Sequence, residues 1–273
     1  MVFSKALYFV LLLYTVNSGE SRSLKSDFSL ERRTRVVSYS TEVDNFFKKL
    51  FPTDPSCLNL AKKKNTRFST YNQDIQKAVQ LVNIYTQDCK AYVGSTGKPL
   101  YDTLNTNLRS GRPSPIWSEM AALLSKGLVL LGPKDFKSLY RGCHCAAVTL
   151  GKPFSFNQFA STTTKPGVAV QFLLAPKGKS FIHIKNARGT DIQPYSHFPG
   201  EQEILLDPNI NLNVVQVETD IKRIRAEIKK ILPTAVIPDN TVAKYVVLDG
   251  SRATKRTKDG FWSTCTCGNL NKF

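Results

Sequence analysis

The first half of the chain has the hydrophobic periodicity of helices. Between residues 73 and 89, apolar side chains recur every three or four positions, which predicts an amphipathic helix with Asn72 as its cap. The same period predicts shorter helices, with Thr41 capping the first and Gly127 marking the end of the last or a turn after it. These helices are expected at residues 41–50, 101–109 and 116–124.

The pattern changes near residue 131 to short apolar runs bounded by Gly, Pro, Asn or Asp, which are typical of β-strands. Residues 154–161 lead into a Thr-rich turn, and 168–174 fit a helical turn or a strand equally well. Residues 220–232 instead predict a basic amphipathic helix, which we expect to pack on the sheet rather than bind an acidic partner or membrane. Strands are expected at 137–141 and 145–150, as a pair or one bent strand, and at 181–184, 204–206, 212–217 and 244–248.

Neither a repeat nor a long linker divides the chain, so one α+β domain is the simplest architecture. We expect a signal peptide at 1–19, a flexible basic arm at 20–40 and a single domain at 41–273. Its helical part would cover 41–131 and its β-rich part 132–273.

The first 19 residues have the pattern of a secretory signal peptide, with Lys5 before an apolar stretch and the small residues Ser18 and Gly19 after it. The apolar stretch is shorter than the ~20 residues that span a membrane, and the C-terminus lacks the hydrophobic tail that precedes lipid anchoring. We therefore expect a secreted, extracellular monomer without a stable membrane anchor. The Arg-rich run that ends at Arg35 is either a processing site or a solvated segment.

Six cysteines in an exported chain predict disulfide bonds. Two C-x-C pairs also suggest zinc, but structural zinc sites usually have wider spacing, so we expect no metal site. Residues two apart in a strand point the same way, so each C-x-C pair is expected to bond elsewhere. One economical pattern ties the C-terminal pair to two upstream cysteines, and the connectivity stays open.

The charge is strongly basic, with 38 Lys and Arg against 21 Asp and Glu, a formal net charge of +17. Such an excess is compatible with binding to nucleic acid, acidic glycans or a cell surface, and equally with solubility alone. No basic stripe is interleaved with aromatic residues, so we expect no specific nucleic-acid partner.

Two carboxylates, Glu201 and Glu203, follow a Pro-Gly turn and precede an apolar run. In an extended backbone, side chains two apart point to the same side, so the pair forms either a solvated acidic turn or a catalytic site. Further upstream, Arg141 ends an apolar run and Ser161 follows an aromatic residue at the mouth of a turn. Each signal is weak alone, whereas their order and spacing are specific.

In that order, these residues resemble the motifs of the arginine-specific mono-ADP-ribosyltransferases, both the secreted and cell-surface vertebrate type and the related bacterial toxins. The family has an Arg on one strand, an aromatic-x-Ser-Thr-Ser segment on a second and a Glu-x-Glu further on. The resemblance covers about residues 68–217. One departure from the motif is Thr163, where the family commonly has a second Ser. The basic helix expected at 220–232 lies beyond the resemblance and looks like an insertion. It implies a helical N-terminal portion packed on a β-sandwich-like ADP-ribosyltransferase core.

The resemblance implies that NAD is the substrate and that several residues bind it. Loss of nicotinamide gives the ribose oxocarbenium character, which Glu203 would stabilise while contacting a ribose hydroxyl. Ser161 would hold Glu203 in position, and Arg141 would bind the pyrophosphate or ribose. Gly142 would admit the nicotinamide carboxamide, and Phe159 belongs to the same NAD-binding set.

Glu201 would then serve the acceptor. The resemblance implies that this first Glu selects a guanidinium group, and a carboxylate can pair with an arginine and take its proton. The expected partners are therefore arginine-containing target proteins. Two alternatives stay open, an NAD glycohydrolase and a catalytically silent basic binding protein on the same scaffold.

Overall fold

The computed structural model describes residues 37–144, 148–174, 180–238, 241–251 and 263–264. The expected signal peptide, Arg35 and nearly all of the expected basic arm lie outside these residues, as do Cys145, Cys265 and Cys267. No helix in the described ranges is long and apolar enough to cross a membrane.

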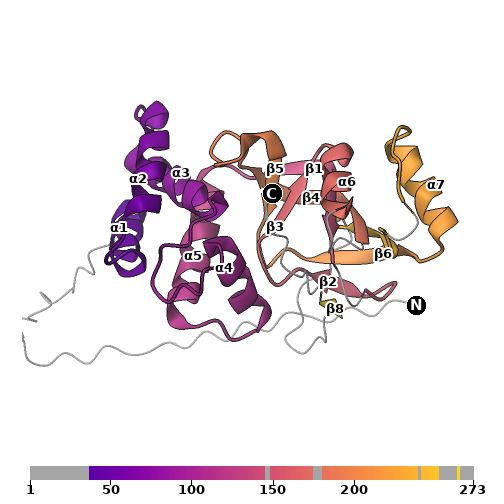
Figure 1. Ribbon diagram of the computed structural model, residues 1–273, viewed down its shortest axis with the longest axis horizontal. Helices are drawn as coiled ribbons and strands as arrows, with labels where there is room; N and C mark the ends of the chain where they lie inside the picture. Colours follow the sequence, from indigo (N-terminus) through magenta and orange to yellow (C-terminus); the bar gives the residue numbers. More distant parts are fainter. Residues whose placement is uncertain (1–36, 145–147, 175–179, 239–240, 252–262, 265–273) are drawn as a thin grey trace, which may run out of the picture. The chain divides into compact units, whose positions relative to one another are not determined.

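Residues 37–131 fold into helices around one apolar core, at the left of Figure 1. Helix α3 contacts α1, α2, α4 and α5, so it lies at the centre of this group. Its buried Leu81 and Ile84 lie in the same core as Phe46 of α1 and Leu124 of α5. The elements are α1 (Tyr39–Leu50), α2 (Ser56–Asn65), the 3-10 helix η1 (Thr66–Phe68), α3 (Gln73–Thr86), α4 (Leu100–Arg109) and α5 (Pro115–Leu130).

The helix starts follow from side-chain caps. Asn72 accepts a hydrogen bond from the backbone N–H of Ile75, which confirms it as the cap of α3. Thr41 is not the cap of α1, because the helix begins at Tyr39 and Ser38 caps it by accepting from the Thr41 N–H. Helix α2 was not anticipated from the hydrophobic pattern, since only Cys57 and Ala61 of its residues are buried.

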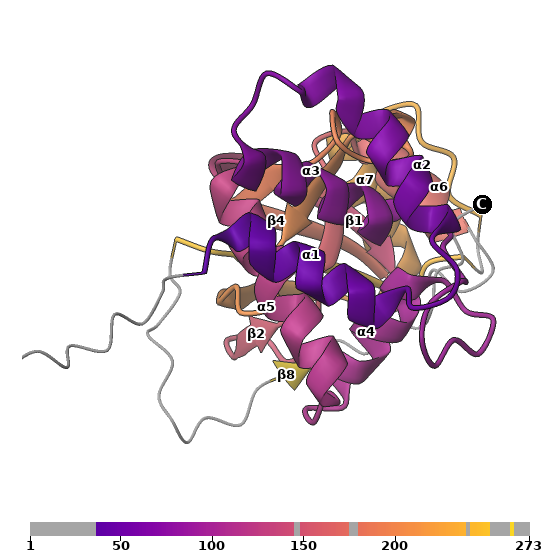
Figure 2. The same ribbon diagram turned by 90° about the vertical axis from the view of Figure 1, so that its left-hand side faces the viewer.

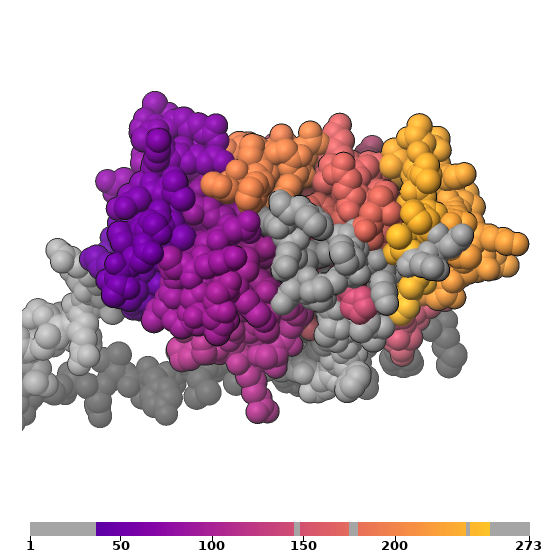
Figure 3. Space-filling model, viewed as in Figure 1, coloured from indigo at the N-terminus to yellow at the C-terminus, as the bar shows by residue number. Residues whose placement is uncertain are grey.

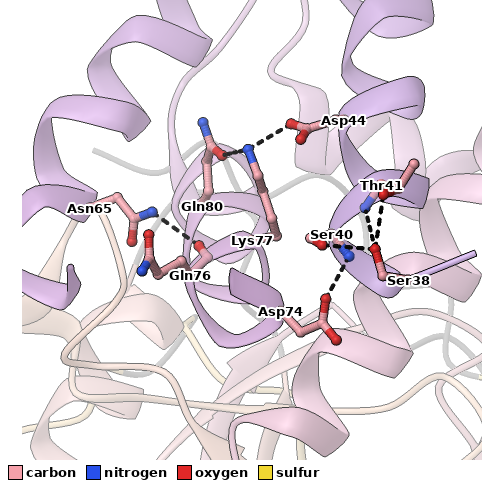
Figure 4. Close-up of polar contacts among 9 residues, drawn as sticks. All are labelled: Ser38, Ser40, Thr41, Asp44, Asn65, Asp74, Gln76, Lys77 and Gln80. Atoms are coloured by element: carbon pink, nitrogen blue, oxygen red, sulfur yellow. Dashed lines mark hydrogen bonds and ion pairs between the residues drawn. The ribbon is translucent and has the colours of Figure 1, made fainter. Parts of the chain in front are cut away.

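Polar contacts at the outer side of the helices fix α1 and α2 against α3 (Figure 4). The Ser40 N–H donates to Asp74 Oδ1 at 2.8 Å, and Lys77 forms an ion pair with Asp44 at 2.6 Å. Asn65, the last residue of α2, donates to the carbonyl of Gln76. A disulfide between Cys57 and Cys89 adds a covalent link across the segment that contains α2 and α3. This pairing excludes bonds from the C-terminal C-x-C pair to either of these two cysteines.

Gly127 does not end α5, which continues to Leu130. A Cβ at Gly127 would lie 2.5 Å from the Tyr39 hydroxyl and 3.4 Å from the Ala78 Cβ. The glycine therefore serves close helix packing, and the expected helix end at this position is wrong.

The rest of the described chain forms a sheet whose pairings close on themselves. Strand β1 pairs with both β3 and β4, while β5 pairs with β3 on one side and with Thr190 and Asp191 of β4 on the other. Strand β4 then continues the sheet through β7, β6, β2 and β8. The strands are β1 (Lys134–Cys143), β2 (Pro153–Ser155), β3 (Ala160–Thr163), β4 (Ser180–Asp191), β5 (Glu203–Leu206), β6 (Leu212–Glu218), β7 (Lys244–Asp249) and β8 (Ser263–Thr264).

Several expected boundaries are corrected here. Thr162 and Thr163 belong to strand β3 rather than to a turn, because they pair with β5. The described residues 148–150 of the expected second strand are not in a strand. The ambiguous segment 168–174 is helical, as part of α6 (Pro166–Leu174).

The sheet is covered on two sides. Helices α1–α5 lie on one side, where Phe159, Ile192 and Leu205 join the helical core (Figure 2). On the other side, α6 and α7 (Ile221–Ile231) pack on β1 and β7, with Ile224 and Ile228 of α7 buried. The expected packing of the basic helix on the sheet is confirmed, as is the α+β class with a helical N-terminal portion on a β-rich core.

Candidate active site

A pocket opens where the helical group meets the sheet. It encloses about 790 Å³ when the open solvent at its mouth is counted. Its walls come from α3, α4, β1, β3, α6 and the segment before β5. All six residues selected from the sequence line it, namely Arg141, Gly142, Phe159, Ser161, Glu201 and Glu203.

Arg141 is held at the pocket by the neighbouring strand. Tyr140 of β1 is the register partner of Thr163 in β3, so the two strands run side by side at this point. The Arg141 guanidinium Nη1 donates to the carbonyl oxygen of Ser161. The strand pairing and this hydrogen bond fix a positive charge in the wall of the pocket.

Ser161 and Glu203 connect the next two strands. The Ser161 hydroxyl donates to Glu203 Oε1, and Glu203 is only 2% exposed. On the following residues, the Thr162 hydroxyl donates to the carbonyl of Ile204 at 2.7 Å. A buried carboxylate is costly unless it is hydrogen-bonded, so these contacts give Glu203 a defined position.

Glu201 reaches the same pocket by a different backbone route. It ends the 3-10 turn η2 (Pro199–Glu201), and Gln202 then takes a left-handed conformation with φ of 48°. The expected reason for convergence, alternation along an extended strand, is therefore wrong. Both carboxylates nevertheless line one pocket, with Glu203 buried at the start of β5 and Glu201 partly exposed.

Gly142 has a structural reason to be glycine. A Cβ at this position would lie 2.6 Å from the backbone N of Leu173 and would collide with the carbonyl of Ala169. The absence of a side chain therefore lets α6 pack closely on β1. Because Val168 and Phe172 of α6 line the pocket, this close packing also sets one of its walls.

Helix α4 supplies pocket residues that the motif analysis did not assign to the site. Tyr101, Asn105 and Arg109 all line the pocket. They are spaced by four residues, so they share one face of the helix. Arg109 Nη1 donates to the side-chain oxygen of Gln158, another pocket residue. The signal in the sequence was this polar stripe on a helix whose other face is apolar.

Asn105 and Tyr85 join helices α3 and α4 to the segment before β3. Asn105 donates to the Tyr85 hydroxyl and accepts from the Phe159 N–H, both at 3.1 Å. The rings of Tyr85 and Phe159 meet edge to face at 5.8 Å. Burial, reinforced by the negative charge of Glu203, raises the pKa of Tyr85, so the phenol stays neutral beside the carboxylate.

The sequence matches the family model described as NAD:arginine ADP-ribosyltransferase over residues 61–232. The chain belongs to this family. The matched range begins at residue 61, ahead of the motif resemblance at about residue 68, and it includes all of α7. NAD is the substrate of the family, and the pocket of this member is lined by two arginines, Arg109 and Arg141, and by the carboxylates of Asp102, Glu201 and Glu203.

Solved structures share the fold at low sequence identity. Exoenzyme S from Pseudomonas aeruginosa, bound to carba-NAD and human 14-3-3 protein beta, is 17% identical with a TM-score of 0.52, covering 78% of this chain and 88% of its own. The eukaryotic mono-ADP-ribosyltransferase ART2.2 is 18% identical with a TM-score of 0.52, covering 84% and 88%. The type III effector XopAI from Xanthomonas axonopodis pv. citri is 12% identical with a TM-score of 0.53, covering 76% and 86%. No curated protein sequence matches the chain.

Proposed function

We propose that this protein is a secreted mono-ADP-ribosyltransferase that moves ADP-ribose from NAD to arginine side chains of target proteins and releases nicotinamide. The observation that carries the proposal is that Glu201 lines the same pocket as Arg141, Ser161 and Glu203. The hydrogen-bonded Glu203 suits the sugar, and the partly exposed Glu201 suits an incoming side chain.

In the first half of the reaction, the bond between nicotinamide and the anomeric carbon of NAD breaks and nicotinamide leaves with the bonding electrons. The ribose then carries oxocarbenium character. Glu203 stabilises this positive charge, and its hydrogen bond from Ser161 keeps the carboxylate oriented. Arg141 binds the anionic part of NAD and is itself held by the Ser161 carbonyl.

In the second half, a guanidinium nitrogen of the target arginine forms the new bond to the anomeric carbon. Glu201 pairs with the guanidinium and takes the proton that this nitrogen loses. A carboxylate serves this step better than an amide, because only the carboxylate can accept the proton and compensate the positive charge.

Secretion is supported by the N-terminal pattern and by the disulfide. Residues 1–19 have a basic residue, an apolar stretch and a small-residue cleavage site. The bond between Cys57 and Cys89 is of a kind that persists in oxidising compartments. Expression of the full chain in a secreting host should give protein in the culture medium whose N-terminus is residue 19 or 20. Protein that stays inside the cells with Met1 intact would contradict export.

The enzymatic proposal is tested with labelled NAD and agmatine, a small guanidine. Formation of ADP-ribosyl-agmatine with an equal amount of nicotinamide is expected. Nicotinamide release with free ADP-ribose alone would identify an NAD glycohydrolase. If the protein binds a heparin column but does not turn over NAD, the outcome would support a catalytically silent basic binding protein.

A further inference from the structure

The segment that precedes Glu201 is bonded to the helical group at consecutive carbonyl oxygens. Residues 192–198 connect β4 to η2, and we call them the acceptor loop. Three successive carbonyls of this loop each accept a hydrogen bond from a side chain outside it. The bonds run from Arg67 Nη2 to Pro194 O at 2.9 Å, from Asn83 Nδ2 to Tyr195 O at 2.9 Å, and from Lys64 Nζ to Ser196 O.

Further contacts continue the same attachment. The N–H of His197 donates to the Thr86 hydroxyl at 2.8 Å. The ring of Tyr195 meets that of Phe68 edge to face at 5.3 Å. In Figure 3, the orange segment before β5 lies directly against the purple helices. The acceptor loop is therefore bonded to α2, η1 and α3 over four successive residues.

The loop depends on these donors because its own backbone bonds are few. The N–H groups of Tyr195 and Ser196 both point back to the carbonyl of Ile192. Ser196 is fully buried, so its carbonyl would pay a desolvation cost if the lysine were removed. Hydrogen bonds at successive carbonyls fix the path of the acceptor loop. This path sets the position of η2, which follows the loop and ends at Glu201.

Glu201 and Glu203 are thus positioned by different parts of the molecule. Glu203 lies in β5, paired with β3 and bonded to Ser161. Glu201 precedes the strand and follows the acceptor loop, separated from Glu203 by the left-handed Gln202. A disturbance of the loop should therefore move Glu201 more than Glu203.

Two cationic side chains, Lys64 and Arg67, lie close to each other at the acceptor loop. Lys64 and Arg67 are close enough that burial and the charge of Arg67 lower the pKa of Lys64. Within the described residues, neither cation forms an ion pair with a carboxylate. Both instead direct donors at backbone oxygens, which compensates their mutual repulsion.

We propose that Lys64, Arg67 and Asn83 are positioning residues for Glu201, which set the acceptor side of the reaction through the acceptor loop. This inference rests on the proposed arginine transfer. All three donors lie between Cys57 and Cys89, so the disulfide joins the two ends of the segment that presents them. They act on the efficiency of transfer to the guanidine and not on the cleavage of NAD.

The test measures transfer to agmatine and hydrolysis of NAD side by side in Lys64→Met and Arg67→Met. Each change removes a donor while keeping a long side chain. We expect kcat/KM for agmatine to fall about 10-fold in each, since small displacements of a reacting group are costly, with hydrolysis unchanged within about twofold. Lys62→Met is the matched control, because Lys62 is an exposed lysine on the same helix. It should leave both rates unchanged.

Agmatine has no protein surface, so a loss of target docking cannot produce this result. Lys64→Arg restores a donor and should recover part of the transfer rate. Equal losses of transfer and hydrolysis, or no loss of either at an unchanged Tm, would overturn the inference. Asn83→Leu removes the third donor and should act like the other two variants. If it does not fold, Lys64→Met and Arg67→Met still decide. Absence of transfer in the wild-type protein would instead refute the proposed function itself.

Discussion

Ser161 and Glu203 are joined by a side-chain hydrogen bond although they are not register partners. Ser161 pairs with Leu205 and Thr163 with Glu203, so the bonded side chains are diagonal neighbours on one face of the β3–β5 pair. Diagonal neighbours are within reach of each other only when the strands keep this register. The geometry of this hydrogen-bonded pair therefore depends on strand pairing as well as on residue identity.

Ser161→Ala should weaken both reactions together, because the carboxylate of Glu203 would lose its oriented donor. We expect nicotinamide release and agmatine transfer to fall by the same factor, about 10- to 100-fold. Ser161→Thr keeps the hydroxyl and should lose less. A loss confined to transfer, with normal NAD cleavage, would contradict the assigned role.

Glu201→Gln and Glu203→Gln should separate the two halves of the reaction. Glu203→Gln removes the charge that stabilises the ribose cation, so transfer and hydrolysis should both fall by at least about 100-fold. Glu201→Gln should abolish transfer to agmatine while hydrolysis of NAD continues. The two variants are matched in size and charge change, so similar mild effects of both would show that the roles are not divided.

The residues of the candidate site could be selected from the sequence because few residues, in a fixed order, make up the motifs. The motifs indicate Arg141, Ser161, Glu201 and Glu203, and all four line the pocket. The sequence predicts that Glu201 and Glu203 point to one side because the backbone between them is extended. This reason is wrong, since Gln202 has a left-handed backbone. Such a conformation is uncommon for a residue other than glycine, so the local sequence gave no signal for it.

Other features depend on long-range contacts that local patterns do not record. Glycine favours helix termini, so the sequence predicts a helix end or a following turn at Gly127, whereas close packing against Tyr39 explains this glycine. Helix α2 has too few buried residues to show a clear apolar face. The bond from its Lys64 to the acceptor loop crosses 132 positions of sequence, so local patterns give no signal for it.

The packing at Gly127 can be tested by a double-mutant cycle with Tyr39. Gly127→Ala should destabilise the protein by about 1–3 kcal/mol, because the new methyl group would lie 2.5 Å from the Tyr39 hydroxyl. That hydroxyl also donates to the Leu123 carbonyl at 3.0 Å, so it has little freedom to move. The free energy of unfolding in urea measures the effect.

Tyr39→Phe removes the hydroxyl and provides the control. In that background, Gly127→Ala should be neutral or stabilising, because alanine favours a helix interior over glycine by about 1 kcal/mol. Contact residues show such coupling, whereas independent sites are additive. Additive effects of the two substitutions would show that the methyl group of Ala introduced at position 127 does not clash with the Tyr39 hydroxyl.

His183 should make the stability of the fold dependent on pH. Its ring stacks on Tyr140 at 4.9 Å, with Nε2 3.0 Å from the Ser138 hydroxyl and Nδ1 3.5 Å from the Tyr245 hydroxyl. Burial, with a smaller effect from the charge of Lys185, lowers the pKa of His183 from 6.5 to about 4. The folded protein therefore keeps this ring neutral at a pH where the unfolded chain protonates it.

Between pH 6.5 and about 4, the unfolded chain binds more protons at this histidine than the folded protein does. The free energy of unfolding must then rise with pH across this window and fall as the solution is acidified. Wild-type protein should lose more stability between about pH 7.5 and about pH 5 than His183→Gln, whose side chain keeps polar contacts but does not titrate. Urea unfolding of both proteins at each pH measures the difference. Equal losses would mean that His183 is protonated in the folded state and that the aromatic stack accommodates its charge.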